Sequence, residues 1–578
     1  MKQIEKVFPI FLFALLSLII IAPLLTPGYI LTLDQVTAGK TAFPSWMSPA
    51  FLFGSVMAFL NLFLPSYFLQ KIILFLIFFL AGLSMYYFLP GKLGSIRYFG
   101  GTFYAINPFF YERVMAGHWN LLLGYAVLPF IISSTLQFLE NPSKKKAFIL
   151  AVLTTILFSV VVHFILIFMS FFAVLSVIFL IFNQNRLSSI LKYSAVFLLF
   201  VFLLNINWLL LSFIGRGNLA LTISQFSRAD LIIFQSVADK NFGLIVNLAS
   251  GYGFWPEVYD YFISPKNVNI FWPVISAAII LISVYGFVRL VKEKEKKRFP
   301  LVIALIVFFL LSLNFAGGIA LRSFADTAFT LYDKVPFLRG FREPQKLIGI
   351  VMLCYAFFGS MGIYYLGKKV ARIGKLVITG IFIILPFVYT PTFFGSFWGQ
   401  LRPVLYPSSW EKVNQTLKED TGDFLTVFFP WHQYMRFKFT NNMVVANPAS
   451  YYFDKPILSA QNYETKYLDT HDVRMEALHV DGLLSIEKNK VNLLGDPVHR
   501  KIAWGEDLAL INVKYIILAK EKDQKLYRFL DRSEGLEKIF EDDNLILYKN
   551  NRWSLDSNKE TQPLEEYTEE DLVGLDKT

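Results

Sequence analysis

The first of three places where ionisable residues stand beside long apolar segments is Asp34. It is the only acidic residue between residues 26 and 50, a stretch that follows an apolar run. Charges beside or within a membrane domain are costly and tend to serve a function. A carboxylate there can accept the proton of a hydroxyl nucleophile. It can equally be an exposed loop carboxylate or the cap of a helix that begins near Gln35, and the residues alone leave these interpretations open.

The second place is the segment NPFFYERVMAGHWN, residues 107–120. Glu112 and Arg113 could bind a polar substrate, or they could simply pair with each other. His118 precedes Trp119, an arrangement that is also typical of the aromatic belt at a membrane surface. A lone histidine is weak evidence for a metal, because metal sites need several ligands.

The third place is the segment RGFREP, which contains Arg339 and Arg342. A planar guanidinium group donates paired hydrogen bonds to phosphate, so two of them at a helix end could hold a lipid diphosphate. Ordinary anchoring to lipid head groups is the competing explanation. Arg216 and Arg228 are further cations on the same face, and Lys71 departs from the charge bias described below. The residues predicted to bind a donor phosphate or substrate are Lys71, Glu112, Arg113, His118, Arg339 and Arg342.

Several common chemistries have no motif in this sequence. It contains no Walker motif, no Cys/His metal site and no convincing Ser/His/Asp order. The single cysteine, Cys354, excludes an intrachain disulfide. The net charge of +11 would suit nucleic acid, but the basic residues cluster in short loops between apolar runs, as in membrane proteins. We therefore expect no nucleic-acid partner.

The composition requires a lipid bilayer. Of 578 residues, 55% are hydrophobic and only 17% are charged, and the mean hydropathy is +0.50. Soluble domains usually carry about 25% charge. Because a spanning helix needs about 20 apolar residues, we expect about eleven transmembrane helices. They are predicted at residues 7–25, 72–89, 98–110, 121–139, 147–161, 164–182, 193–213, 270–291, 299–315, 347–366 and 373–388.

The charge pattern sets the predicted orientation. Segment 51–64 is apolar but short, so we interpret it as an interfacial or re-entrant helix. Every dense basic cluster then falls on one side, which the positive-inside rule makes cytoplasmic. Counting 51–64 as a span would move the cluster 144–146 outside. The N-terminus is thus predicted to be cytoplasmic and the C-terminal region extracytoplasmic, in a multi-pass protein of the plasma membrane.

The predicted fold class is a polytopic α-helical membrane protein with a C-terminal extracytoplasmic α/β domain. The membrane domain covers residues 1–391, with long outer loops at 26–50, 214–269 and 316–346. The α/β domain covers 392–550, with strands at 424–429, 443–446, 513–518 and 545–548. Its helices are expected to begin at Ser408, which has capping-box spacing to Glu411, and at residues 464–477 and 523–530. The acidic tail 551–578 is predicted to be disordered.

Several stretches, taken together, resemble the GT-C superfamily of polytopic membrane glycosyltransferases, most closely its YfhO-type and arabinofuranosyltransferase-like branches. They are GYILTLDQ around Asp34, YAINPFFYERVMAGHWNLLLGYAVLPF, VPFLRGFREPQKL, FFPWHQYM, and INVKYIILAK with the closing NLILYKN. The resemblance implies a polyprenyl-phosphate sugar donor, an extracytoplasmic glycolipid, polysaccharide or glycoprotein acceptor, and transfer with inversion. It also implies that Asp34 is the general base. Many members carry paired acids in this loop, whereas Gln35 follows Asp34 here, so no cofactor is implied with certainty and a divalent metal stays an open question.

Two other classes of function stay open. A lipid-linked sugar transporter or flippase would need polar residues in mid-span, for which Asn205, Asn207 and Asn314 are candidates, although helix–helix hydrogen bonds explain them equally well. A non-catalytic membrane assembly protein would tolerate replacement of each outer acid. The sequence leaves the sugar, the acceptor and the oligomeric state undefined.

Overall fold

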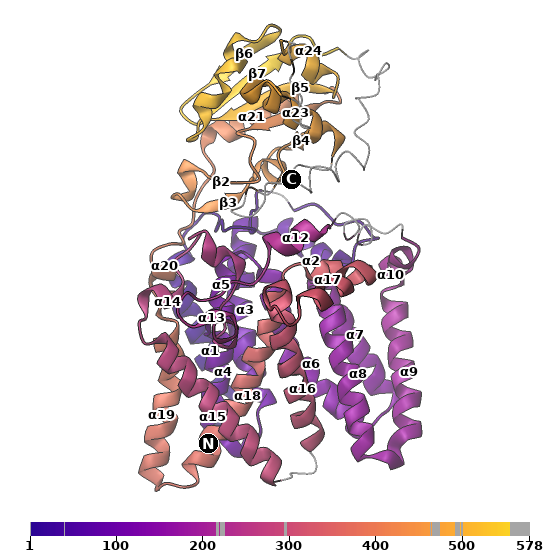
Figure 1. Ribbon diagram of the computed structural model, residues 1–578, viewed down its shortest axis with the longest axis vertical. Helices are drawn as coiled ribbons and strands as arrows, with labels where there is room; N and C mark the ends of the chain where they lie inside the picture. Colours follow the sequence, from indigo (N-terminus) through magenta and orange to yellow (C-terminus); the bar gives the residue numbers. More distant parts are fainter. Residues whose placement is uncertain are drawn as a thin grey trace. The chain divides into compact units, whose positions relative to one another are not determined.

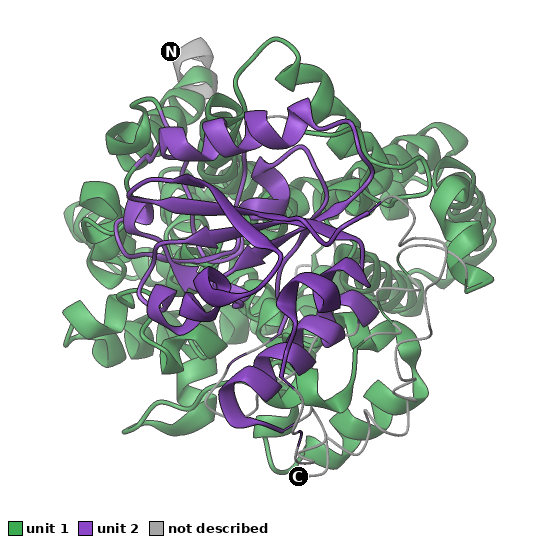
Figure 2. Ribbon diagram, turned by 90° about the horizontal axis from the view of Figure 1, so that it is seen from above, with its two compact units in different colours: residues 1–27, 40–402 green, residues 28–39, 403–578 purple. Residues whose placement is uncertain are grey.

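The computed structural model describes residues 2–39, 41–215, 219, 223, 226–293, 298–462, 464, 474–491, 498 and 501–554, with side chains from residue 7 onward. Arg216, most of the expected helix at 464–477 and most of the acidic tail lie outside these residues. The chain divides into two compact units (Figure 2). Unit 1 contains residues 1–27 and 40–402, and unit 2 contains residues 28–39 and 403–578.

Unit 1 is a bundle of apolar helices (Figure 1). Within the described residues, nine helices are long and apolar enough to cross a membrane, so the chain is a multi-pass membrane protein. They are α1 (Lys2–Ile21), α3 (Ser66–Phe88), α6 (Trp119–Glu140), α8 (Phe164–Phe182), α9 (Leu187–Leu204), α15 (Trp272–Glu293), α16 (Phe299–Gly317), α18 (Ile348–Gly367) and α19 (Arg372–Tyr389).

Three of the expected spans are shorter or broken. The one at 193–213 divides at Asn205 into α9 and α10 (Ile206–Phe213). The one at 147–161 corresponds to α7 (Lys144–Val160), whose 17 residues begin after the N-cap Ser143. The one at 98–110 is interrupted, because α4 (Ile96–Ala105) ends before α5 (Pro108–Met115) begins. The Asn107 side chain accepts a hydrogen bond from the Phe110 amide and so caps α5. The apolar segment at 51–64 forms α2 (Phe51–Asn61), which with 11 residues is too short to span a membrane.

Helix α18 lies at the centre of the bundle. Nearly all of its residues are buried, whereas α9 and α19 expose most of their apolar side chains, as expected where a helix faces lipid. α18 and α15 approach closely through two glycines. A Cβ atom on Gly286 would lie 2.0 Å from the Phe358 carbonyl oxygen, and one on Gly362 would lie 2.0 Å from the Ile282 oxygen. Small residues allow this approach, as they commonly do between membrane helices.

The described parts of the loops at 214–269 and 316–346 fold into short helices. They are α12 (Arg228–Ile233), α13 (Gly243–Ala249), η4 (Trp255–Val258), α14 (Pro265–Val268), η5 (Gly318–Ala320), α17 (Ala325–Lys334), η6 (Pro336–Phe341) and η7 (Pro344–Leu347). The loops at 214–269 and 316–346 are hydrogen-bonded to each other. Gln345 Nε2 donates to the Phe234 oxygen over 2.7 Å, and the Tyr332 hydroxyl donates to the Ser227 oxygen over 2.7 Å.

Unit 2 is an α/β fold built on a five-stranded sheet of order β4-β1-β5-β7-β6. Strand β1 is parallel to β4 and β5, and β7 is antiparallel to β5 and β6. The strands are β1 (Leu425–Phe429), β4 (Ile457–Leu458), β5 (Val513–Ala519), β6 (Leu536–Glu541) and β7 (Leu545–Asn550). A separate antiparallel pair joins β2 (Tyr434–Arg436) to β3 (Val444–Ala446). The expected strands at 424–429, 443–446, 513–518 and 545–548 are thus confirmed.

Both faces of the sheet are covered. Along β5, Ile516 and Leu518 point into one core, and Tyr515 and Ile517 point into the other, as the two-residue period of a strand requires. The covering helices are α21 (Ser408–Glu419), α22 (Ala449–Tyr452), α23 (Met475–Asn489), α24 (Trp504–Ala509) and the 3₁₀ segment η10 (Gln524–Arg532). The capping box expected at Ser408 is wrong, because the N-cap of α21 is Pro407 and makes no side-chain cap.

Residues 28–39 form a strap that belongs to unit 2 rather than to the membrane bundle. Tyr29 pairs with Val404 through two backbone hydrogen bonds, and the Ala446 amide donates to the Leu33 oxygen over 2.7 Å. Leu31 and Val36 are buried in the same core as Trp410. The expected limit at residue 391 therefore differs from the structural one, which follows Arg402 and assigns this early segment to the later unit.

Candidate active site

The strongest candidate site in unit 1 is a buried ion-pair cluster around Glu343. This residue immediately precedes η7 and is 5% exposed. Its Oε2 atom lies 3.1 Å from Arg113 Nη1 and 3.3 Å from Lys346 Nζ, and its Oε1 accepts from Trp255 Nε1 over 3.2 Å. A loop before α18, the helix α5 and the segment η4 thus meet at one carboxylate.

Arg113 is held from two further directions. His118 Nδ1 lies 2.8 Å from Arg113 Nη1, and since arginine has only donors, that nitrogen accepts. The guanidinium carbon lies 3.6 Å from the centre of the Phe254 ring, which is a cation–π contact. The predicted residues Arg113 and His118 are therefore brought together, and their position is fixed by packing as well as charge.

The charges of this cluster alter its acid–base behaviour. Burial alone would raise the pKa of Glu343, but the charges of Lys346 and Arg113 hold that pKa well below its usual range. His163 lies at the edge of the cluster, with Nε2 at 3.1 Å from Lys346 Nζ. Burial, reinforced by Lys346, lowers the pKa of His163 to about 3, so this imidazole is neutral near pH 7. The cluster consequently combines a fixed anion with several cations.

The two predicted arginines near η6 make different contacts. Arg342 Nη1 lies 3.0 Å from Asp230 Oδ1, and its guanidinium packs 4.3 Å from the Phe226 ring centre. Arg339 Nε donates a weak hydrogen bond to the backbone carbonyl oxygen of Tyr332 over 3.4 Å. Arg342 is adjacent to Glu343 in the chain, and its charge also lowers the pKa of that carboxyl.

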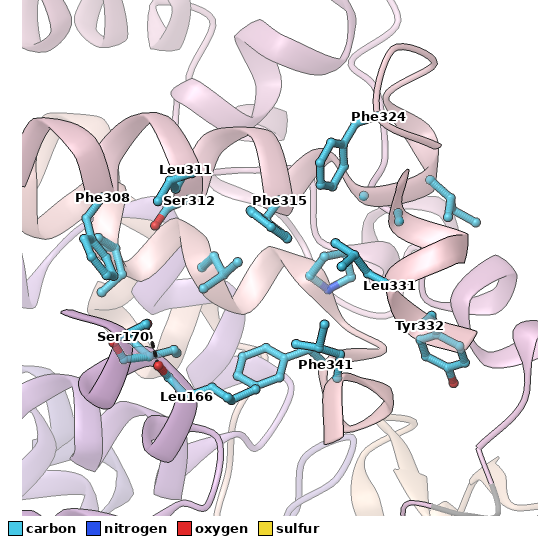
Figure 3. A pocket seen from close by; sticks show the side chains of 18 of the residues that line it. Leu166, Ser170, Phe308, Leu311, Ser312, Phe315, Phe324, Leu331, Tyr332 and Phe341 are labelled. Atoms are coloured by element: carbon cyan, nitrogen blue, oxygen red, sulfur yellow. Dashed lines mark hydrogen bonds between the residues drawn. The ribbon is translucent and has the colours of Figure 1, made fainter. Parts of the chain in front are cut away.

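An apolar cavity of about 370 Å³ adjoins this segment of unit 1 (Figure 3). Its walls come from α8, α16, α17, η6 and the start of α18, and the labelled side chains in Figure 3 are almost all aromatic or aliphatic. Phe341, Pro344 and Leu347 line the cavity, and they alternate along the chain with the charged Arg342, Glu343 and Lys346. The Phe341 ring also packs against His163, with 5.4 Å between ring centres. The segment 341–347 therefore contributes both to the apolar wall of the cavity and to the buried ion-pair cluster.

Glu112 lies in a different buried group from its neighbour Arg113. Lys266 bonds to Glu257 and lies 3.6 Å from Asp239, and Glu112 is close to Glu257. Burial, reinforced by Glu257, raises the pKa of Glu112 well above its usual range. Arg113 pairs with Glu343, and its charge only partly offsets the effect of burial on Glu112. Glu112 is instead a buried carboxyl that favours its neutral form.

Two other predicted residues belong to α3 and to the strap of unit 2. Lys71 is buried in α3, where its ammonium donates to the Thr26 carbonyl oxygen and lies 5.1 Å from the Tyr67 ring centre. Asp34 belongs to the strap of unit 2, where its carboxylate is exposed and accepts a hydrogen bond of 2.6 Å from the Tyr434 hydroxyl. Asp34 is therefore oriented by the β2 strand of its own unit.

Sequence reasoning missed Glu343, Lys346, Trp255 and His163 as members of the cluster. Glu343 and Lys346 lie within the quoted segment VPFLRGFREPQKL, so adjacency to Arg342 was the available signal. No sequence signal linked Trp255 and His163 to Glu343, because only the folded structure brings their loops to this residue. In the part of the chain that the structure describes, no group of three His, Cys, Asp or Glu side chains could hold a metal ion.

Comparison with known proteins locates the fold. No protein-family model matches the chain, and no curated protein matches it. Solved structures of arabinofuranosyltransferase AftD from Mycobacteria do match. One is 11% identical over 95% of this chain with a TM-score of 0.55. Two further structures are classes of an AftD point mutant. One has a TM-score of 0.54 and is 11% identical over 94% of this chain, and the other has a TM-score of 0.52 and is 12% identical over 95% of this chain.

These similarities define a fold. AftD is a GT-C enzyme, so they support the GT-C part of the resemblance and leave the YfhO-type branch unassigned. The chain spans only about two fifths of the AftD chains, since it covers 40%, 41% and 41% of them. The chain is therefore a polytopic membrane protein of GT-C-like fold with a C-terminal α/β region.

Proposed function

We propose that this protein is a membrane glycosyltransferase that uses a sugar linked to a polyprenyl phosphate. The observation that carries the proposal is the ion-pair cluster around Glu343, built into the same segment as the wall of an apolar cavity. The fold shared with an arabinofuranosyltransferase supports it. The transferase belongs to the multi-pass proteins of the plasma membrane, with unit 2 outside the cytoplasm and a glycan or lipid as acceptor.

The cavity and the cations suit the two ends of such a donor. A polyprenyl chain is apolar and branched, and the lining of aliphatic and aromatic side chains offers it a matching environment. The phosphate leaves with negative charge when the sugar is transferred, and cations fixed in a water-poor site stabilise that charge. Arg113, Lys346 and Arg342 are the proposed donors to the phosphate, with His118 positioning Arg113.

Asp34 is the proposed general base. Glycosyl transfer to a hydroxyl requires a carboxylate to take the acceptor proton as the new bond forms. A phosphate leaves without protonation, so a single carboxylate is enough for an inverting reaction, unlike the two of a glycosidase. The exposure of Asp34 leaves its carboxylate accessible, and Tyr434 orients it. A divalent metal stays outside the proposal.

A transfer assay with a panel of radiolabelled polyprenyl-phosphate sugars tests both parts. Membranes that contain the wild-type chain should move label into an acceptor. Asp34→Asn should lower the rate by about 10²- to 10⁴-fold, because the base is lost. Tyr434→Phe should lower it by about fivefold, because one orienting hydrogen bond is worth roughly 1 kcal/mol. Asp543→Asn, an exposed acid of the same unit, is the matched control and should leave the rate unchanged.

The cavity has its own test. Ser312 lines it, and Ser312→Phe would fill part of the space proposed for the lipid. We expect a higher KM for long-chain donors and little change for donors with a short, water-soluble chain. Leu310→Phe places the same side chain on an exposed position of α16 and should change neither. Equal loss with both kinds of donor would contradict the assignment of the cavity to the lipid chain.

A further inference from the structure

A short segment of unit 1 contacts two neighbouring residues of α5. The segment is 253–257, which includes the first residues of η4. The centre of its Phe254 ring lies 3.6 Å from the guanidinium carbon of Arg113. Its last residue, Glu257, is close to Glu112. Adjacent residues of α5 therefore contact different parts of the same segment, one through a cation and the other through a carboxyl group.

Glu257 is surrounded by hydrogen-bond donors. Its Oε1 atom accepts hydrogen bonds from the amides of Gly253 and Phe254, and its Oε2 atom accepts one from the ammonium of Lys266. The same ammonium lies 3.6 Å from Asp239, so two carboxylates share its charge. In each of its contacts Glu257 is the acceptor, as an ionised carboxylate is.

Glu112 has the opposite surroundings. It is 1% exposed, and no described residue donates a hydrogen bond to its Oε1 atom. A buried carboxylate without donors is costly, whereas a neutral carboxyl group carries an O–H donor of its own. Burial, reinforced by Glu257, raises the pKa of Glu112 well above its usual range, and Lys266 and Arg113 offset this only in part. Glu112 is thus a donor, and Glu257 is the acceptor beside it.

The remaining groups that face Glu112 are phenols. Tyr111, Tyr252 and Tyr389 all interact with it electrostatically. Burial raises the pKa of Tyr111 and of Tyr252, so both hydroxyls stay neutral near pH 7. These phenols add no charge that could stabilise an ionised Glu112. The anion of Glu257 is therefore the charge that an ionised Glu112 would have to face.

We infer that Glu112 is a positioning residue, whose carboxyl proton makes a hydrogen bond to Glu257 and so fastens η4 to α5. The same contact places Trp255, which donates to Glu343, and the ring that packs on Arg113. When Glu112 releases its proton to the solvent, two anions face each other in a buried place, and η4 is driven away from α5. The effect on donor binding rests on the proposed function, whereas the contact itself does not.

The direction of the pH dependence follows from the raised pKa of Glu112. The stabilisation of the contact is complete below about pH 4.5, where the carboxyl group is protonated whether η4 is attached or detached. It is lost as the pH rises through the higher pKa of the folded state. Between these two values, each pH unit weakens the attachment about tenfold.

Hydrogen exchange of the purified full-length protein in detergent measures this loss. The probes are the amides of Gly253 and Phe254, which Glu257 holds. Between pH 5 and pH 8, their protection in the wild-type protein should fall by about tenfold or more relative to Glu112→Gln. The glutamine side chain keeps a donor for Glu257 and does not titrate.

Two further variants complete the comparison. Glu112→Ala removes the donor, so its segment 253–257 should be less protected than that of Glu112→Gln at every pH. Asp326→Asn replaces an exposed acid of α17 and should follow the wild-type pH profile. Parallel profiles for the wild type and Glu112→Gln would overturn the inference. So would a Glu112→Gln protein that is no better protected than Glu112→Ala or does not fold, because the amide keeps the inferred hydrogen bond.

The effect on the candidate site has a separate readout. The KM of the wild-type protein for a polyprenyl-phosphate sugar should rise over the pH range in which the protection falls, relative to Glu112→Gln at the same pH. A constant ratio of the two KM values would overturn the positioning role and leave the transferase assignment intact. A protein that transfers no sugar would contradict the proposed function, and the exchange comparison alone would then decide whether Glu112 fastens η4.

Discussion

Glu343 holds a carboxylate between two buried cations, and this makes it a sensitive residue of unit 1. Replacing it with Gln keeps the shape but leaves Arg113 and Lys346 buried without their shared anion. Breaking a buried pair in this way costs about 3–5 kcal/mol. We therefore expect Glu343→Gln to lower the thermal unfolding midpoint of the purified protein substantially.

The control for this prediction is an exposed pair. Asp333 bonds to Arg228 at the surface, and Asp333→Asn should shift the midpoint little, because water screens such pairs. A double variant, Glu343→Gln with Arg113→Gln, should lose less stability than the two single losses added together. Full additivity would show that Glu343 and Arg113 do not interact.

His432 predicts a pH dependence in unit 2. Its Nδ1 lies 2.7 Å from Glu464 Oε2 and its Nε2 lies 3.1 Å from Asp523 Oδ2. Burial alone would lower the pKa of His432, but the two carboxylates outweigh it and raise the pKa above 6.5. A raised pKa means that the protonated form stabilises the fold. This stabilisation is complete below about pH 6.5 and is lost as the pH rises through the higher pKa of the folded state.

Hydrogen exchange can measure this loss selectively. Peptides from β1 and the β2–β3 pair should lose protection between pH 6 and pH 9 in the wild-type protein, relative to His432→Gln at the same pH. The glutamine variant lacks the titrating group, so the comparison removes the intrinsic pH dependence of exchange. Parallel behaviour of the two proteins would contradict the prediction.

At this scale the sequence identified some members of the candidate site and not their partners. Arg113 and His118 were predicted from a short segment, and the structure brings them together. Glu343 was passed over because its partners come from α5 and η4, and no local pattern links those segments. Glu112 was predicted with the same set, yet it faces Glu257, because adjacent residues on a helix point in different directions. The role of Asp34 stays a prediction.

Among the elements, the contact between α15 and α18 makes the clearest prediction. Gly362→Ala would place a methyl group 2.0 Å from a backbone oxygen, so the helices must separate. Overpacking of this kind costs about 1–3 kcal/mol or more, which exceeds the roughly 1 kcal/mol that alanine gains in helix propensity. We expect a lower yield of folded protein and a lower unfolding midpoint in detergent.

Gly380 in α19 supplies the matched control, since a Cβ atom there meets nothing within 4 Å. Gly380→Ala should leave the midpoint unchanged or raise it slightly, through propensity alone. If Gly362→Ala behaved in the same way as Gly380→Ala, the close approach of α15 and α18 would be in doubt.

Long apolar helices and apolar strands could be predicted from the hydropathy of the sequence. Elements whose form depends on contacts with neighbouring elements could not. The β5 and β7 strands are apolar runs and were found, whereas β6, with the sequence LEKIFE, carries alternating charge at a sheet edge and was missed. The span at 98–110 was expected to be one continuous helix, because the apolar run in the sequence has no interruption. Asn107 and Pro108 end one helix and begin another inside that run, which hydropathy does not register.

For the whole molecule, the strap of residues 28–39 predicts that unit 2 is incomplete when produced from its C-terminal part alone. Leu31 and Val36 are 4% and 7% exposed, and burying such side chains stabilises by about 1.5–3 kcal/mol each, as an upper estimate. We expect a soluble protein of residues 403–554 to gain several kcal/mol when residues 28–39 are joined to its start.

Urea unfolding of the two fragments measures this gain. The fused fragment with Leu31→Ser and Val36→Ser should lose most of it, because the strap then brings no apolar surface to the core. Equal midpoints for the fragments with and without the strap would show that it does not contribute to folding. No sequence pattern predicted the strap, because its hydrogen-bond partners, Val404 and Ala446, lie far from residues 28–39 in the sequence.

The strap also sets an order of events during synthesis. Residues 28–39 leave the ribosome directly after α1, whereas the core that receives Leu31 and Val36 is translated after the helix bundle. The apolar side chains of the strap therefore have no core to pack against while the helix bundle is inserted into the membrane. Once the core closes on them, the chain passes between the two units at residues 27–28, 39–40 and 402–403. Unit 2 is then joined to unit 1 at three points of the chain instead of one, so its core can close only after the helix bundle has been made.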